Sequence, residues 1–193
     1  MVGPEGRVEG FEPQEYAVEL ALRNINLNRF AHVRINRFAV SSKIGKRFLD
    51  TSRGAVAASI VKNFGGSKGE MVPVTTLDTF AKEHLISRVD LIKMDIEGAE
   101  FEALLGAQHV INAYRPVIVL EAADGDAAWV RSRELLMGHE YETYAFAPSG
   151  DLVRFKRLSS YYPSVVFIAR NSSFSADRNF SANAASSTGL YSR

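Results

Sequence analysis

The 193-residue chain contains no cysteine and only one tryptophan. The absence of cysteine excludes disulfide bonds, thiolate metal sites and cysteine nucleophiles. It is also consistent with a reducing compartment, and we therefore expect a cytoplasmic protein. A hydrophobic content of 46% is ordinary for a folded domain of this length, so the chain is expected to bury a sizeable core.

The sequence also lacks a large net charge and long hydrophobic runs. Lys and Arg number 23 against 22 Asp and Glu, which leaves a formal net charge of +1 and no general attraction for nucleic acids or acidic membranes. No apolar run approaches a membrane span, and the N-terminus has no basic stretch followed by an apolar segment. We therefore predict neither a nucleic-acid nor a membrane partner, and the sequence leaves the oligomeric state open.

Histidine is scarce and scattered. The four histidines show no metal-ligand spacing, such as a pair four residues apart on one helix. These are His32, His84, His109 and His139. The sequence therefore predicts no metal site.

What the chain does contain is an alternation of strand and helix patterns. This order predicts an α/β fold with a mostly parallel sheet and helices on its faces. Strands are predicted over residues 7–11, 32–40, 89–95, 116–121, 141–146 and 164–169, and helices over 15–26, 77–85, 97–111 and 129–137. Pro13 is expected at the first position of the first helix, and Thr75 or Thr76 at the cap of the second. Residues 45–69 indicate a hairpin or an irregular excursion.

The segment 89–100 is the most informative part of the sequence. An apolar run interrupted only by Lys93 gives way to Asp95 and Glu97 at the predicted start of a helix. Open α/β sheets bind ligands at the carboxyl ends of their strands, so these acids are candidates for an active site. The residues alone also allow Asp95 to be a helix N-cap and Glu97 an acid that complements the helix dipole. Lys93 is either a neighbour of these acids or a residue whose stem lies along an apolar surface.

Five ordered segments resemble the FkbM family of S-adenosylmethionine-dependent methyltransferases. They are Gly6–Pro13 (GRVEGFEP), Asn24 and Asn28, Thr76–Asp78, Asp90–Glu100 (DLIKMDIEGAE), and Arg115–Pro116 leading into a strand that ends at Glu121. The Asp90–Glu100 run is the most distinctive of the five, and the resemblance extends over residues 7–170.

This resemblance implies a Rossmann-like class I methyltransferase sheet, mostly parallel with an antiparallel last strand. It also implies S-adenosylmethionine as methyl donor and O-methylation of a hydroxyl on a sugar or small natural product. Because methyl transfer from a sulfonium is a displacement, the protein mainly aligns donor and acceptor, and a carboxylate takes the hydroxyl proton. The implied catalytic residues are Asp95, Glu97 and Glu121, and the implied cofactor-binding residues are Glu12, Ser41 and Asp95.

Several of these residues have an alternative interpretation. Glu12 is suited to accept hydrogen bonds from both ribose hydroxyls, yet an acid near a helix N-terminus, or one serving an NAD ribose, has the same pattern. Ser41 lies where similar chains approach the adenine ring, and a turn serine fits equally well. Glu121 ends a buried strand, where it either reaches the acceptor pocket or caps a loop.

The family's first strand and glycine-rich cofactor turn have no counterpart in this sequence, since only five residues precede the GRVEGFEP segment. We therefore expect an N-terminally incomplete domain over residues 1–170, followed by a disordered Ser/Asn/Ala-rich tail over 171–193. A truncated enzyme is favoured over a degenerate relative. The alternatives to a methyltransferase are a non-catalytic Rossmann-like module and another nucleotide-binding enzyme of the NAD type. Acceptor recognition is expected in residues 45–70 and 122–128.

Overall fold

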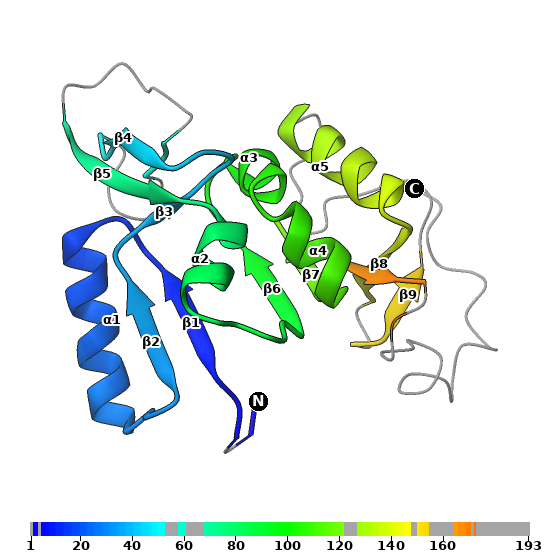
Figure 1. Cartoon of the computed structure of the whole chain (residues 1–193), viewed down its shortest axis with the longest axis horizontal. Helices are drawn as coiled ribbons and strands as arrows, with labels where there is room; N and C mark the ends of the chain where they lie inside the picture. Colours follow the sequence, from blue (N-terminus) through cyan, green and yellow to red (C-terminus); the bar gives the residue numbers. More distant parts are fainter. Residues whose placement is uncertain are drawn as a thin grey trace.

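The computed structural model of the chain describes residues 2–3, 5–52, 58–60, 68–121, 127–147, 150–154, 164–170 and 172. These residues form a mixed α/β fold with the strands in three separate sheets. Figure 1 shows one of these sheets beside α1 at one end of the molecule, and α5 with β8 and β9 at the other. The predicted tail at 171–193 lies outside the described residues, apart from Ser172.

The first sheet is a parallel pair, β1 (Val8–Phe11) and β2 (Val33–Asn36), joined by helix α1 (Glu15–Asn28). Gln14 is the N-cap of α1, so Pro13 precedes the cap and does not occupy the first helical position as predicted. The helix ends at Arg29, whose left-handed backbone directs its N–H, and that of the next residue, back to carbonyls of the last turn. α1 buries none of its side chains completely, and its main contact is with β2.

The predicted strand 32–40 is divided between two sheets. After β2 the chain turns and continues as β3 (Ala39–Val40), which pairs in parallel with β5 (Gly69–Thr75). β5 also pairs antiparallel with β4 (Gly45–Asp50), so the first strand of this hairpin lies in the predicted range 45–69 and the second lies almost wholly beyond it. The strand β5 was not predicted.

Helix α2 (Leu77–Glu83) follows β5 directly. Thr76 is its N-cap, and the Thr76 hydroxyl accepts a 3.0 Å hydrogen bond from the Thr79 N–H, which resolves the choice between Thr75 and Thr76. Phe80 is buried on the inner side of α2 and meets Phe11 of β1 edge to face, with ring centroids 4.7 Å apart. This aromatic contact joins the β1–β2 unit to the rest of the fold.

The largest sheet has the order β6-β7-β10-β8-β9. Its strands are β6 (Leu91–Met94), β7 (Val117–Leu120), β8 (Tyr141–Phe146), β9 (Leu152–Arg154) and β10 (Val165–Ala169). β6 and β7 are parallel, whereas β10 is antiparallel to both of its neighbours, as expected for the last strand. β9 was not predicted.

The expectation of one mostly parallel sheet is wrong for the described residues. Four of the seven strand pairs are antiparallel. Among the described strands β1 pairs only with β2 and β6 only with β7, so nothing joins the two edges into one sheet. β6 is consequently an edge strand, and Leu91 is 58% exposed rather than covered on both faces.

The single helix predicted over 97–111 is two short helices, α3 (Glu100–Leu105) and α4 (Gln108–Tyr114). Asp78 of α2 caps the second, because its two carboxylate oxygens accept the N–H groups of His109 and Val110 at 3.0 and 2.9 Å. The interruption falls immediately before Gln108, a polar residue among the apolar positions of this segment.

The main core lies where α3, α4 and α5 (Ala127–Gly138) pack against the five-stranded sheet. Its largest fully buried side chains include Leu104, Ile111, Ile118, Leu120, Leu136 and Phe167. Trp129 packs on Phe167, so the tryptophan is a core residue. No helix among the described residues is long and apolar enough to cross a membrane.

Candidate functional site

Three carboxylates meet at the carboxyl ends of β6 and β7. The two strands are parallel with Met94 opposite Leu120, so the next residues, Asp95 and Glu121, leave the sheet side by side. The Glu121 N–H donates to the Met94 carbonyl at 3.3 Å and continues the pairing past the strand. Oxygens of Asp95, Glu97 and Glu121 all lie within 4.8 Å of one another. The structure thus brings together the three residues that the sequence analysis implied for catalysis.

Glu97 reaches this group from a tight turn, not from a helix. Its φ of 54° is left-handed, and Gly98 follows with a φ of 92°. A left-handed backbone costs a non-glycine residue roughly 1–2 kcal/mol, so the surroundings must hold it. The alternative in which Glu97 is a first-turn acid is therefore wrong, and so is that of Asp95 as N-cap, since Ala99 occupies that position.

Glu100 is one of the groups that hold the turn. Its side chain is buried and accepts a 2.9 Å hydrogen bond from the Ile96 N–H. On the other side of Glu97, the Ser59 hydroxyl donates to the Glu97 carbonyl at 3.1 Å. From the sequence, Glu100 was recognised only as the last residue of the Asp90–Glu100 run, and Ser59 was not identified. The position of Glu100 four residues after Ile96 was the available signal for its role in the turn. No local sequence signal indicates the role of Ser59.

The electrostatics of the site centre on Glu121. Burial raises the pKa of Glu121, and the charge of Asp95, a hydrogen bond with Asp95, and the charges of Glu97 and Glu100 raise it further. Lys93 partly balances these charges through a 3.1 Å contact with Asp95, which confirms Lys93 as a neighbour of the acids. A carboxyl group with a raised pKa beside a second acid is a candidate for proton transfer.

The trio also has the spacing in which a divalent cation contacts several carboxylates at once. Exposed acids commonly gather without an ion, and Asp95 is more than half exposed. The prediction of no metal site stays a prediction.

Replacing Glu121 with glutamine is expected to stabilise the protein at pH 7. An acid whose pKa is raised by folding binds its proton more tightly in the folded chain, so the folded state loses stability as pH rises past the unfolded pKa. Glutamine cannot ionise, and we expect a gain on the order of 0.5 kcal/mol, kept small by solvent screening. The gain should vanish near about pH 4, where glutamate itself is protonated.

Urea unfolding of the wild type and Glu121→Gln at the two pH values measures this effect. Glu134→Gln, which removes an exposed charge from α5, is the matched control and is expected to change stability little at either pH. Equal stability of Glu121→Gln and wild type at pH 7 would contradict the repulsion among the acids.

Glu12 occupies the junction between β1 and α1. Its N–H donates to the Asn36 carbonyl at 3.1 Å, and its Oε1 accepts the Gln14 N–H at 2.7 Å. Burial raises the pKa of Glu12, and the hydrogen bond from Gln14 opposes this. Oε1 of Glu12 thus binds a backbone N–H at the start of α1, whereas Oε2 accepts no hydrogen bond from the described residues. No hydrogen bond or ion pair of the described residues joins Glu12 to the acid trio.

Ser41 is fully enclosed, immediately after β3. Its N–H donates to the Thr75 carbonyl at 3.0 Å, and its hydroxyl is buried without a partner among the described residues. A buried hydroxyl without a partner is uncommon and costly. Both the adenine role and the interpretation as a turn serine stay predictions. The adjacent Ser42 hydroxyl donates to Glu102 of α3 at 2.6 Å.

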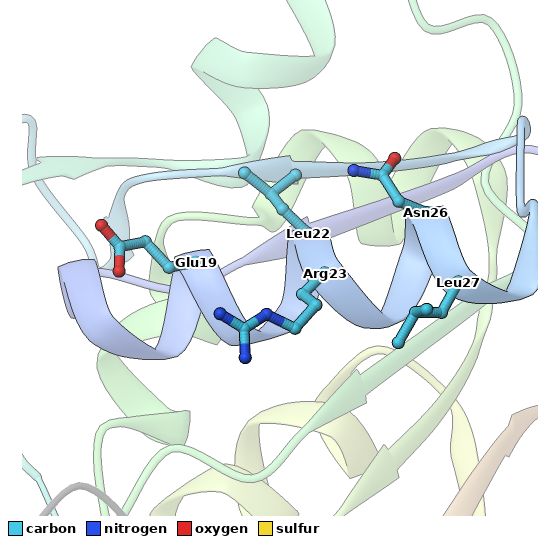
Figure 2. Close-up of a pocket in the computed structure, with 5 residues that line it drawn as sticks. All are labelled: Glu19, Leu22, Arg23, Asn26 and Leu27. Atoms are coloured by element: carbon cyan, nitrogen blue, oxygen red, sulfur yellow. The ribbon is translucent and has the colours of Figure 1, made fainter.

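A shallow hollow elsewhere on the surface lies on α1. Figure 2 shows its lining side chains along the helix: Glu19, Leu22, Arg23, Asn26 and Leu27. None of the predicted site residues lines it. Of the segments expected to recognise the acceptor, residues 122–126 and much of 53–67 lie outside the described residues.

Residues 1–142 match the family model of the methyltransferase FkbM domain. The chain belongs to the FkbM family. A solved structure similar to it is methyltransferase FkbM from Methylobacillus flagellatus KT, at 18% sequence identity and a TM-score of 0.49. That similarity covers 83% of this chain and 36% of the other, so this FkbM domain spans about a third of that protein's length. A comparison with curated proteins found no match.

Proposed function

We propose that this FkbM domain belongs to an S-adenosylmethionine-dependent O-methyltransferase. The grouping of Asp95, Glu97 and Glu121 at the ends of two adjacent parallel strands carries the proposal. Family membership supports a methyltransferase, and the acid trio supports a hydroxyl as the group that is methylated, because a hydroxyl must lose a proton when it becomes an ether.

The adjacent carboxylates of Asp95 and Glu121 are the general base in this proposal. When bound, S-adenosylmethionine supplies an electrophilic methyl group on a positively charged sulfur. The acceptor hydroxyl would lose its proton to the carboxylates of Asp95 and Glu121 as its oxygen takes up the methyl group that S-adenosylmethionine would supply. Glu97 adds negative charge, which raises the pKa of Glu121 and so stabilises its protonated form.

Two features of the chain fit the cofactor. Glu12 has one carboxylate oxygen without a hydrogen bond from the described residues, and a carboxylate is a good acceptor for ribose hydroxyls. Ser41 has a buried hydroxyl without a partner, as expected of a group that lacks its ligand. Glu12, Ser41 and Asp95 are the residues that would hold the cofactor.

The acceptor in this proposal is a sugar or small natural product without negative charge. Three carboxylates repel phosphates and other anions, which disfavours nucleic acids as substrates. The net charge of the whole chain points in the same direction.

Calorimetric titration of the purified chain with S-adenosylhomocysteine tests the proposal, because this product binds without the unidentified acceptor. We expect saturable one-to-one binding and no response to NAD under the same conditions. Binding of NAD instead would identify a different nucleotide enzyme. A folded chain indifferent to both ligands would favour a non-catalytic module and overturn the proposed function of this polypeptide.

A further inference from the structure

Residues 58–60 form a short anchored segment between β4 and β5. Ser59 pairs with Asp50 at the end of β4 through two backbone hydrogen bonds of 3.0 and 3.2 Å. On either side of it, Ala58 and Ile60 pack against the apolar cluster of the three-stranded sheet. The backbone of Ser59 is therefore fixed by the hairpin sheet, which is separate from the sheet that bears the acids.

The side chain of Ser59 contacts the turn that carries Glu97. Its hydroxyl donates to the Glu97 carbonyl at 3.1 Å, and only 2% of the residue is exposed. Because this hydrogen bond is buried, water competes little for its donor and acceptor, and the bond is stronger than an exposed one.

The turn around Glu97 is thereby held on both sides. The Glu100 carboxylate accepts the N–H of Ile96, the residue before Glu97. The Ser59 hydroxyl donates to the carbonyl of Glu97 itself. The next residue is Gly98, which permits many backbone conformations. Without the Ser59 hydroxyl, the peptide group between Glu97 and Gly98 loses the contact that opposes its rotation.

We propose that Ser59 is a positioning residue that keeps the Glu97 carboxylate against Asp95 and Glu121. The proposal deepens the proposed function, on which its catalytic meaning rests, by naming a group outside the acid-bearing sheet that sets the geometry of the proton-accepting site. Through Ser59, residues 58–60 are linked to the turn that carries Glu97. Residues 58–60 belong to the range 45–70, which was expected to contribute to acceptor recognition.

The test compares Ser59→Ala with Ser59→Thr, which keeps the hydroxyl. Ser52→Ala is the matched control, since the Ser52 hydroxyl binds Asp50 at 2.6 Å in the same hairpin without contacting Glu97. The readout is the pH titration of the side-chain carboxyl carbon of Glu121 by NMR, with thermal unfolding of each variant alongside.

We expect Ser59→Ala to move the apparent pKa of Glu121 toward that of an ordinary glutamate, because the Glu97 charge is released from its neighbour. Ser59→Thr and Ser52→Ala should retain the wild-type titration, even if they unfold at a lower temperature. An unchanged titration in Ser59→Ala, or an equal change in Ser52→Ala, would overturn the positioning role. This experiment uses no cofactor, so its failure is distinct from failure to bind S-adenosylhomocysteine.

Discussion

Replacing Gly106 with alanine is expected to lower the free energy of unfolding by about 3 kcal/mol, the upper range for overpacking a tight site. Gly106 lies between α3 and α4, where an added Cβ would stand 2.1 Å from the Ser41 carbonyl oxygen. It would also stand 3.1 Å from the Thr76 Cβ. Real Cβ atoms do not approach a backbone oxygen so closely, so one of the two segments must move.

Neither segment can move easily. The Gly106 carbonyl accepts the Asp78 N–H at 2.9 Å, and the Gly106 N–H donates to carbonyls within α3. Ser41 is itself tied to Thr75. The strain therefore falls on the contact between the end of α3 and the Ser41 segment, which is bonded to the hairpin sheet.

Equilibrium urea unfolding measures the loss. Gly138→Ala is the control, because a Cβ at Gly138 meets no atom within 4 Å and alanine is the better helix former. We expect Gly138→Ala to be neutral or slightly stabilising. A change below about 1 kcal/mol for Gly106→Ala would show that α3 and the Ser41 segment adapt freely, contrary to close packing of this joint.

Replacing Glu12 with glutamine is expected to weaken binding of S-adenosylhomocysteine about 10- to 100-fold, the value of a hydrogen bond to a charged group. In the proposed function the Glu12 carboxylate accepts hydrogen bonds from the ribose hydroxyls. Glutamine keeps the shape of the side chain and one acceptor oxygen, which can still receive the Gln14 N–H. The folded state should therefore survive while ribose recognition is impaired.

Calorimetry on the two proteins gives the ratio of affinities. Glu15→Gln is the matched control, since it removes a negative charge from the same end of α1 but from an exposed residue paired with Arg37. An equal loss in both variants would indicate a general effect of charge at the helix N-terminus. Unaltered affinity in Glu12→Gln would remove Glu12 from the cofactor site.

Local patterns in the sequence were sufficient to place most elements. The strands at Val8–Phe11, Leu91–Met94 and Tyr141–Phe146 are short apolar or alternating runs, and the structure has them where predicted. The elements that were not predicted, β5 and β9, are both held by antiparallel pairing with a neighbouring strand. Pairing of this kind depends on where the neighbour lies, and local sequence does not encode it.

The sequence by itself determined the family and the acids of the site, because the run Asp90–Glu100 and the strand before Glu121 are contiguous patterns. Adjacent parallel strands end at one edge of a sheet, so the meeting of Asp95 and Glu121 followed from the fold class. Only the tertiary structure decided that the strands form three sheets, that Glu97 lies in a left-handed turn, and that Ser59 holds it. The physical reason is distance along the chain: Ser59 and Glu97 are 38 residues apart, and their contact exists only after two sheets have packed together.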